Sequence, residues 1–466
     1  MLIFKEILHQ TLAVTPVNFN EFSQGIGYGW ISPTLETLSH PDSVIPLNTE
    51  QKSWIASLQE IGRTVGPLLS LLLLDTIGRK KSLIISAGAF FLQWTIILFT
   101  KSVWVIGAIR LLFGIDVGIN DVTSSIYFGE NATPSIRGIF GSVAVSFFYV
   151  GVLLEYFFTN YFSYYTVALI NAILGGIALI TAVLLRESPQ FLIMKGKLDQ
   201  AKKNFEYLKG DRNDEHVQRE FSDIKKNIRQ EQQRKESLAK LFSTPFIYKI
   251  TLIVFIQYTL TQATGFSAVQ SFATLSFSNS GFFTKKELTI LLGLVQLVAV
   301  FSSAFFVERF PRKTMLRTFY GLAALVHLCS AALFYTQQYI CQVPHFSTYI
   351  FISIASYSTI YAVGILPSFC LLRGELFPQS IKVIGGCISI IGNSVMGIFI
   401  NYMYLIVAEK YGIYMNYVFF SVCSFATVLF VRFKIPETRG KTLVDIQRSI
   451  DKKSIKIKDD RNPETI

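Results

Sequence analysis

Cysteine and charged residues are both scarce in this 466-residue chain. The five cysteines all lie in the second half of the sequence, at Cys329, Cys341, Cys370, Cys387 and Cys423. Because their number is odd and they are widely spaced, they argue against a disulfide framework and against a zinc site. Charged side chains make up 16% of the residues, whereas soluble domains usually contain about 25%. The composition is therefore not that of an ordinary soluble domain.

Several functional motifs are also missing. The sequence has no nucleotide-binding loop of the Gly-x-x-x-x-Gly-Lys-Ser/Thr type, no cluster of metal ligands and no pairing of a nucleophile with a base. We therefore expect no cofactor, no metal and no enzymatic activity. The N-terminus lacks the basic region and cleavage site of a signal peptide, so we expect the first apolar segment to be retained. The net charge of +12 is spread over loops, which argues against a nucleic-acid partner.

Long apolar segments dominate what is present. Hydrophobic residues make up 51% of the chain, and 41 residues are Phe. A bilayer requires about 20 mostly apolar residues for each spanning helix, and in lipid a helix satisfies its own backbone groups. The sequence therefore predicts an all-α membrane protein with twelve transmembrane helices. The predicted spans are residues 11–31, 54–74, 82–100, 104–127, 139–159, 164–185, 247–274, 288–307, 314–335, 347–371, 383–407 and 413–432.

The basic residues predict the orientation of these spans. If the N-terminus is cytosolic, about 36 Lys and Arg lie in cytosolic segments and 5 lie outside. Basic residues accumulate on the cytosolic side of membrane proteins. We therefore predict that both termini are cytosolic and that the protein resides in the cell membrane.

Acidic and basic residues recur at equivalent helix ends of the two sequence halves. Asp75 opens the stretch Asp-Thr-Ile-Gly-Arg-Lys-Lys, and Glu308 opens a weaker copy 233 residues later (308 − 75). Glu130 and Glu375 are 245 residues apart (375 − 130), and Glu187 and Glu437 are 250 apart (437 − 187). Similar offsets indicate an internal repeat, the design of transporters built from two six-helix halves.

This repeat predicts four parts. Residues 1–185 form an N-terminal six-helix half, and residues 247–433 form a C-terminal six-helix half. Between them, residues 186–246 form a charged cytosolic linker with short helices, or alternatively a disordered connection. Residues 434–466 form a cytosolic tail.

The ordered set of motifs resembles the sugar porters of the major facilitator superfamily, and among them the insect facilitated trehalose transporters. The matching pieces are Gly29-Trp30-Ile31-Ser32-Pro33, Asp75-x-x-Gly78-Arg79-Lys80-Lys81, Arg110-x-x-x-Gly114-x-x-x-Gly118, Tyr127-x-x-Glu130-x-x-x-Pro134-x-x-Arg137-Gly138, Glu187-Ser188-Pro189, Glu375-Leu376-Phe377-Pro378 and Pro436-Glu437-Thr438-Arg439-Gly440-Lys441-Thr442-Leu443. The resemblance runs along the whole chain. It implies the twelve-helix fold of that superfamily, a sugar as substrate and alternating access as the mechanism.

Charged residues at the cytosolic helix ends are candidates for a gate. They are Asp75, Arg79, Glu130, Arg137, Glu187, Glu308, Arg309, Glu375, Glu437 and Arg439. Arginine and carboxylate groups form strong bidentate pairs, which can latch the two halves in the outward-open state. The alternative is ordinary interfacial charge, for which exposed pairs contribute about 0–1 kcal/mol each.

Ionisable residues also occur inside the first six predicted spans. Glu21, Arg63, Arg110 and Asp116 are candidates for coupling transport to a proton. Glu60 and Arg63 are three residues apart on one helix face, so they can pair. The alternative is a self-neutralising network that only holds the helices in register. Glu155 lies in the fifth span.

The resemblance also implies residues that contact the substrate. Thr261 and Gln262 take the place of a pair of glutamines, and Ser267 takes the place of an asparagine. Gln270, Gln296 and Asn393 complete the predicted site. Other positions depart from the sugar-porter pattern: Val145 replaces a glutamine, and Cys370 and Ser394 each replace a tryptophan. The alternative for the amides is hydrogen bonding between helices.

These observations predict facilitated transport of a sugar, a hexose or trehalose, across the membrane. A proton-coupled symporter is the first alternative, and a non-transporting sugar sensor is the second. Beyond the sugar and the lipid bilayer, the sequence indicates no partner.

Overall fold

The computed structural model describes residues 2–210, 214–233, 244–277, 283–377 and 381–439. In these ranges the regular structure is helical, without strands. The N-terminal helices are α1 (Leu2–Gly29), α2 (Ile31–Thr37), α3 (Thr49–Thr76), α4 (Arg79–Phe99), α5 (Val103–Asn131), α6 (Pro134–Tyr161) and α7 (Tyr164–Leu184). Three further helices follow: α8 (Pro189–Met194), α9 (Leu198–Leu208) and α10 (Glu215–Gln233).

The C-terminal helices begin with α12 (Pro245–Ala263) and α13 (Phe266–Ser276). They continue with α14 (Lys285–Arg309), α15 (Arg312–Tyr339), α16 (Phe346–Ile360), the π-helix η1 (Tyr361–Ile365), α17 (Leu366–Leu376), α18 (Lys382–Tyr411) and α19 (Tyr414–Phe433). Each predicted span coincides with one long helix or with a helix that is interrupted once. Ten of these segments are long and apolar enough to cross a membrane. The other two predicted spans lie in α1 and α3, which have 28 residues each.

Two of the predicted spans are interrupted inside the membrane region. The first interruption separates α12 from α13 at Gly265, whose φ of 92° lies in the region that favours glycine. The second is η1, which precedes Pro367 at the start of α17. Proline has no amide hydrogen to donate, so regular helical bonding is lost around it. Interrupted helices of this kind occur in membrane proteins where the backbone is covered by protein.

The described residues group into two compact units. The first unit contains the described residues of 1–235, 267–301 and 397–406. The second contains those of 236–266, 302–396 and 407–466. Consequently α13, most of α14 and the middle of α18 belong to the same unit as the N-terminal helices.

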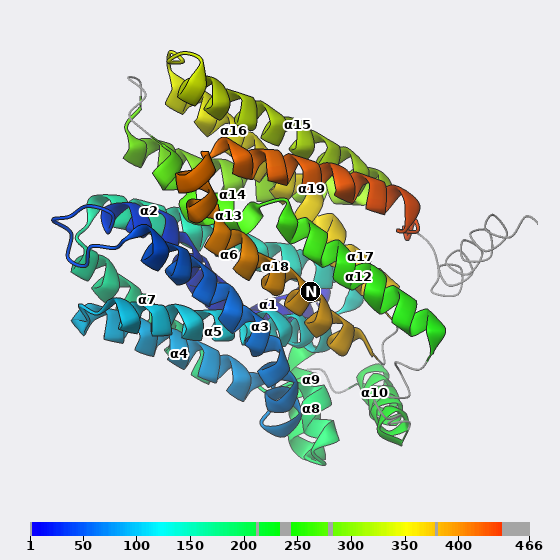
Figure 1. Cartoon of the computed structure of the whole chain (residues 1–466). Coiled ribbons are helices and arrows are strands. Elements are labelled where there is room, and N and C mark those ends of the chain that lie inside the picture. The colour runs from blue at the N-terminus through cyan, green and yellow to red at the C-terminus, as the bar shows by residue number, and fades with distance from the viewer. Residues whose placement is uncertain (1, 211–213, 234–243, 278–282, 378–380, 440–466) are drawn as a thin grey trace, which may run out of the picture. The chain divides into compact units, whose positions relative to one another are not determined.

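Glycine allows two pairs of helices in the first unit to approach closely. A Cβ atom on Gly62 or Gly66 of α3 would overlap the backbone of α5, and one on Gly114 would overlap the backbone of α3. In the same way, Gly25 of α1 lies against the backbone of α6 at Phe148. Small residues at spacings of four permit such close packing in membranes. In Figure 1, α3 and α5 accordingly run side by side.

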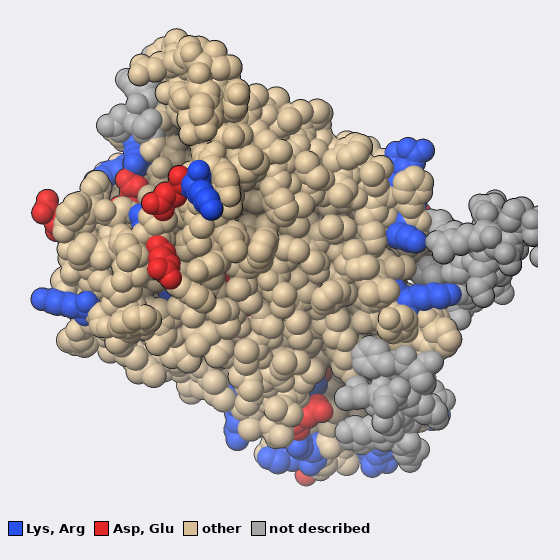
Figure 2. Space-filling view, in the orientation of Figure 1, with Lys and Arg blue, Asp and Glu red and all other residues tan. Residues whose placement is uncertain are grey.

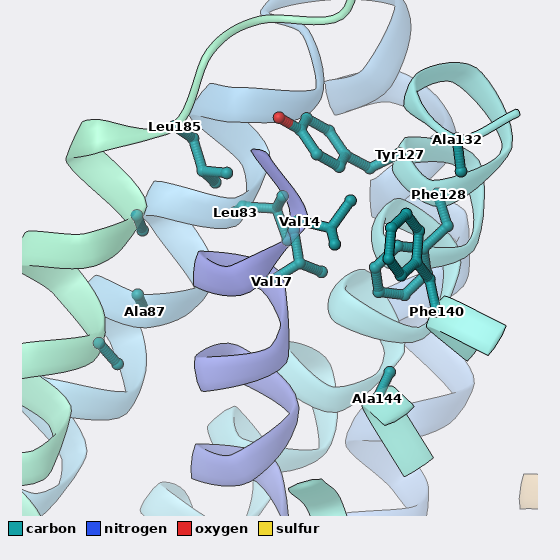
Figure 3. Packing of buried hydrophobic residues seen from close by; sticks show 12 residues of the cluster. Val14, Val17, Leu83, Ala87, Tyr127, Phe128, Ala132, Phe140, Ala144 and Leu185 are labelled. Atoms are coloured by element: carbon teal, nitrogen blue, oxygen red, sulfur yellow. The ribbon is translucent and has the colours of Figure 1, made fainter. Parts of the chain in front are cut away.

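A buried apolar cluster joins α1, α4, α5, α6 and α7 in the first unit. Figure 3 shows Val14 and Val17 of α1 between Leu83 of α4 and Phe140 of α6. At one end of the cluster the Tyr127 hydroxyl donates a hydrogen bond to the carbonyl oxygen of Arg186 at 2.8 Å. The cluster therefore fixes the end of α5 beside the segment that follows α7.

The outer surfaces of the helices are apolar. Many large hydrophobic side chains are exposed, among them Leu92, Ile180, Leu325 and Phe425. On the face shown in Figure 2, charged side chains gather toward the helix ends and the surface over the middle of the helices is uncharged. Such a surface suits contact with lipid.

Candidate functional site

Arg79, Glu130 and Glu187 tie together the ends of several helices in the first unit, and we call them the Arg79 cluster. The Nη2 atom of Arg79, at the start of α4, lies 2.6 Å from Oε1 of Glu130, near the end of α5. These side chains are only 8% and 10% exposed. Glu187 Oε1 accepts hydrogen bonds from the backbone amides of Arg79 at 3.1 Å, Lys80 at 3.2 Å and Ser188 at 2.9 Å.

Glu187 acts as a cap for α4. The first amides of a helix have no partner within the helix, and the helix dipole favours a negative charge beside them. Burial raises the pKa of the Glu187 carboxyl, whereas the amide hydrogen bonds and the charge of Arg79 act in the opposite direction. The amides therefore offset part of the cost of burying this carboxylate.

A second cluster with the same design lies in the second unit, and we call it the Arg312 cluster. Glu437 accepts hydrogen bonds from the backbone amides of Arg312 and Lys313 at the start of α15, both at 3.1 Å. The Nε atom of Arg312 lies 3.5 Å from Oε1 of Glu375. The Thr438 hydroxyl donates to Oε2 of the same Glu375 at 2.5 Å. Arg312, which the sequence analysis did not select, occupies the position equivalent to Arg79, at the same offset of 233 residues (312 − 79).

The remaining gate candidates make fewer contacts. Asp75 is exposed and forms no ion pair among the described residues. Arg137 donates a hydrogen bond to the carbonyl oxygen of Ala132 at 3.4 Å. The side chain of Glu308 lies outside the described residues.

Arg309 and Arg439 extend the Arg312 cluster. Arg439 Nη1 donates to the carbonyl oxygen of Arg309 at 2.6 Å. The guanidinium of Arg309 stacks on the ring of Phe305, 3.7 Å from its centroid. Each described contact of the gate candidates joins residues of the same unit.

The candidate coupling residues lie inside the first unit. Glu21 of α1 accepts a hydrogen bond from Asn120 of α5 at 2.9 Å. Arg63 Nη2 donates to Oδ2 of Asp121 at 3.1 Å. This ion pair with Asp121 of α5 is one that the spacing of Glu60 and Arg63 did not predict. Glu60 is buried on the same helix and interacts electrostatically with Arg63.

Arg110 is buried without a carboxylate at hydrogen-bond distance among the described residues. Its Nη1 donates to the carbonyl oxygen of Gly27 at 2.9 Å, and its Nη2 donates to the side chain of Gln59. The guanidinium lies 5.7 Å from the ring centroid of Trp30 and 5.1 Å from that of Phe113. Neutral oxygens and aromatic faces therefore hold this cation.

Three predicted substrate residues lie within the first unit in contact with residues the sequence analysis missed. Gln270 of α13 donates to the hydroxyl of Tyr156 of α6 at 2.6 Å. Gln296 of α14 donates to Oε1 of Gln270 at 2.7 Å. Ser267 donates to Oδ1 of Asn401 of α18 at 3.0 Å. All five side chains are buried.

The other three predicted substrate residues lie in the second unit. Thr261 hydrogen-bonds the Tyr320 hydroxyl at 2.5 Å. Asn393 donates to the carbonyl oxygen of Tyr258 at 3.2 Å. Gln262 is 2% exposed, and its Nε2 atom has no hydrogen-bond partner among the described residues. Within each unit, these neutral amides and hydroxyls are groups that can exchange hydrogen bonds with the hydroxyls of a small polar solute.

Comparison with known proteins decides the family. Residues 16–449 match the model of the family described as sugar (and other) transporter. This chain belongs to that family. The protein is therefore a multi-pass membrane protein of a transporter family, as the sequence analysis predicted.

Curated relatives of this transporter cover almost the whole chain. It is 24% identical over 462 residues to the facilitated trehalose transporter Tret1 of Bombyx mori, covering 98% of this chain and 90% of that protein. It is 25% identical over 453 residues to the protein of the same name in Polypedilum vanderplanki, covering 95% and 88%.

The fold is similar to solved structures of the xylose transporter XylE from E. coli. The partially occluded inward-open conformation has a TM-score of 0.78 at 20% identity, and the alignment covers 93% of this chain and 100% of that one. The inward-open conformation has a TM-score of 0.76 at 19% identity, covering 93% and 98%. The prediction of a twelve-helix major facilitator superfamily fold is confirmed.

The positions that depart from the sugar-porter pattern differ in their surroundings. Val145 and Cys370 are exposed, and Ser394 is fully buried. The partner residues Tyr156, Tyr320 and Asn401 were missed because tyrosine and asparagine in apolar helices give no signal of their own. They are far in sequence from the predicted residues, and only the folded structure brings them into contact.

Proposed function

We propose that this transporter moves a sugar, a hexose or trehalose, across the cell membrane by facilitated alternating access. The observation that carries the proposal is the buried chain of Tyr156, Gln270 and Gln296, whose neutral donors and acceptors come from three helices. The names of the curated relatives, facilitated trehalose transporters, support the substrate class and the absence of coupling.

The Arg79 and Arg312 clusters are proposed as the two parts of a cytosolic gate. The positive-inside distribution of Lys and Arg supports a cytosolic location for these helix ends and for both termini. The repeated design, with a carboxylate capping the helix that starts with the arginine, supports one shared role in both halves. Residues 1–185 and 247–433 are proposed as these halves, with 186–246 as linker and 434–466 as tail.

Uptake of labelled glucose and labelled trehalose into cells that express the chain at the surface tests the proposal. We expect saturable uptake of at least one sugar that is independent of the proton gradient. Uptake that collapses with the gradient would favour the proton-coupled alternative. Saturable binding without uptake would favour a sugar sensor, and neither binding nor uptake of any sugar would refute the proposal.

Substitution of the glutamines tests the site itself. We expect Gln296→Ala and Gln270→Ala to raise the KM for uptake about tenfold each, because a lost hydrogen bond contributes about 1 kcal/mol or more. The matched control is Gln93→Ala, which removes an equally buried glutamine from α4. If the control changes KM as much as the site variants do, the glutamines are not substrate contacts.

A further inference from the structure

The ionisable side chains inside the first unit are unbalanced in charge. Within the predicted spans its helices carry five carboxyls and two guanidinium groups, and four of these seven groups are at most 3% exposed: the carboxyls of Glu60, Asp116 and Glu155 and the guanidinium of Arg110. Arg63 and Asp121 are 25% and 32% exposed, and Glu21 is half-buried. If the four buried groups were all ionised, their net charge would be −2 (1 − 3). A buried charge without compensation costs several kcal/mol. Some of these carboxyls must therefore be neutral.

The five carboxyls differ in whether a guanidinium group interacts with them. Asp121 pairs with Arg63 at 3.1 Å. Glu60 interacts electrostatically with Arg63 and with Arg110. Within the described part of the chain, the side-chain hydrogen bonds to the other three carboxyls come from neutral groups only. Those three are Glu21, Asp116 and Glu155.

Asp116 lies where α1, α4 and α5 meet. Its Oδ1 accepts a hydrogen bond from the hydroxyl of Ser86 on α4. Its Oδ2 accepts one from Nε2 of Gln24 on α1 at 3.0 Å. The exposed fractions of Asp116, Gln24 and Ser86 are 2%, 3% and 1%. An ionised Asp116 would thus place a full charge in a site closed to water.

Gln24 supplies a second and independent observation. Its Oε1 atom is buried and has no hydrogen-bond partner among the described residues. The site therefore contains more acceptors than donors. A proton on Oδ2 of Asp116 can supply the missing donor after rotation of the Gln24 amide, which places Oε1 where Nε2 now donates to Asp116. The same proton removes the buried charge.

The groups around Asp116 favour the protonated form of its carboxyl. Glu21 on α1 is the titratable group that interacts with it, and its charge has the same sign. Ser86 of α4 and Asn120 of α5 are neutral. The charged groups of α3, Glu60 and Arg63, interact with Asp121 instead.

We propose that Asp116, Gln24 and Ser86 form a proton-binding site whose proton stays bound during transport. The proton comes from hydronium in the surrounding water, and its binding converts the carboxylate to the neutral acid. Its loss places a negative charge at the junction of α1, α4 and α5 and destabilises the folded protein. This site differs from a coupling site, because the proton does not cross the membrane with the substrate.

The pH dependence of unfolding tests the proposal without relying on sugar transport. The full chain, Asp116→Asn and the matched control Asp121→Asn are purified in detergent, and unfolding is followed from about pH 5 to about pH 8. An aspartate in the unfolded chain ionises near pH 4, so the folded wild type holds one proton more than the unfolded wild type. Its stability must then fall as pH rises. We expect the unfolding constant of the wild type to increase up to about tenfold per pH unit relative to Asp116→Asn.

The Asp121→Asn control tests whether the pH dependence belongs to Asp116. Asp121→Asn leaves the Asp116 site intact, so we expect it to keep the wild-type pH dependence while losing stability at every pH. A ratio of wild-type to Asp116→Asn unfolding constants that does not change with pH would overturn the proposal. If Asp116→Asn does not fold, unfolding of the wild type near pH 7 in weak buffer decides, and an absence of proton release would overturn it. Accumulation of sugar driven by a proton gradient and lost with Gln24→Leu would show that the proton moves, which also overturns it.

Discussion

The Arg79 cluster and the Arg312 cluster have the same local structure, but their ion pairs differ in length and in burial. In both, a carboxylate accepts hydrogen bonds from the first amides of a helix, and the arginine at that position pairs with a glutamate of another helix. The Arg79 pair is shorter, at 2.6 Å against 3.5 Å, and its glutamate is 10% exposed against 29%. The repeated sequence therefore specifies the partners, while the surroundings decide how strongly they interact.

The largest expected effect is the loss of stability in Arg79→Ala, which should exceed the loss in Arg312→Ala. Arg79→Ala leaves Glu130 buried without its cation, and breaking a buried pair costs about 3–5 kcal/mol. Arg312→Ala breaks a longer and more exposed pair, which contributes about 1 kcal/mol. Chemical unfolding of the purified variants measures both changes. Equal losses of stability would show that the difference in length and burial between the two ion pairs has no energetic consequence.

A smaller effect is expected for the capping carboxylates. Glu187→Ala and Glu437→Ala each remove several amide hydrogen bonds at the start of a helix, and we expect a loss of about 2–3 kcal/mol in each. Hydrogen exchange should accelerate in the first turn of α4 for one variant and of α15 for the other. Glu187→Gln and Glu437→Gln keep an acceptor and serve as controls. Acceleration in neither helix would mean that the caps are not needed.

The smallest expected effect concerns the residues that precede the two helices. Gly78 has a φ of 95°, and a Cβ atom there would meet the Glu187 carboxyl and the ring of Phe191. We expect Gly78→Ala to cost about 1–2 kcal/mol. Pro311 has an ordinary φ of −61°, so Pro311→Ala should cost less than about 1 kcal/mol. The exposed control Asp75→Asn should change stability by less than about 0.5 kcal/mol. Thermal midpoints of the three variants rank these effects, and a different order would contradict the role of backbone conformation.

The two clusters resemble each other, but the interiors of the two units differ in the charge of their polar groups. The first contains the carboxyls and guanidinium groups of α1, α3, α5 and α6. In the described interior of the second, polar groups such as Gln257, Thr261 and Tyr320 are neutral and hydrogen-bond one another. Among the described residues of the second unit, the buried charged side chains of the first unit have no counterpart, which is why the proton site is expected in the first unit.

The candidate site could be predicted only in part. Gln270 and Gln296 stand out as amides in apolar segments, but their common contact with each other and with Tyr156 depends on the packing of α13, α14 and α6. Likewise the i, i+3 spacing places Glu60 and Arg63 on one helix face, but it does not indicate Asp121 of α5, which forms an ion pair with Arg63. Spacing within one helix cannot report how a neighbouring helix is rotated.

The sequence by itself determined the twelve apolar spans, the repeat of the helix-end motifs and the family. These features depend on local composition and on residues that are near one another in the chain. Tertiary structure decided which buried groups meet: Asp116 with Gln24 and Ser86, and Arg110 with neutral oxygens. It also grouped α13 and parts of α14 and α18 with the N-terminal helices. The physical reason is that a side chain's partner is set by helix rotation and close packing at glycines, which arise only when the helices assemble.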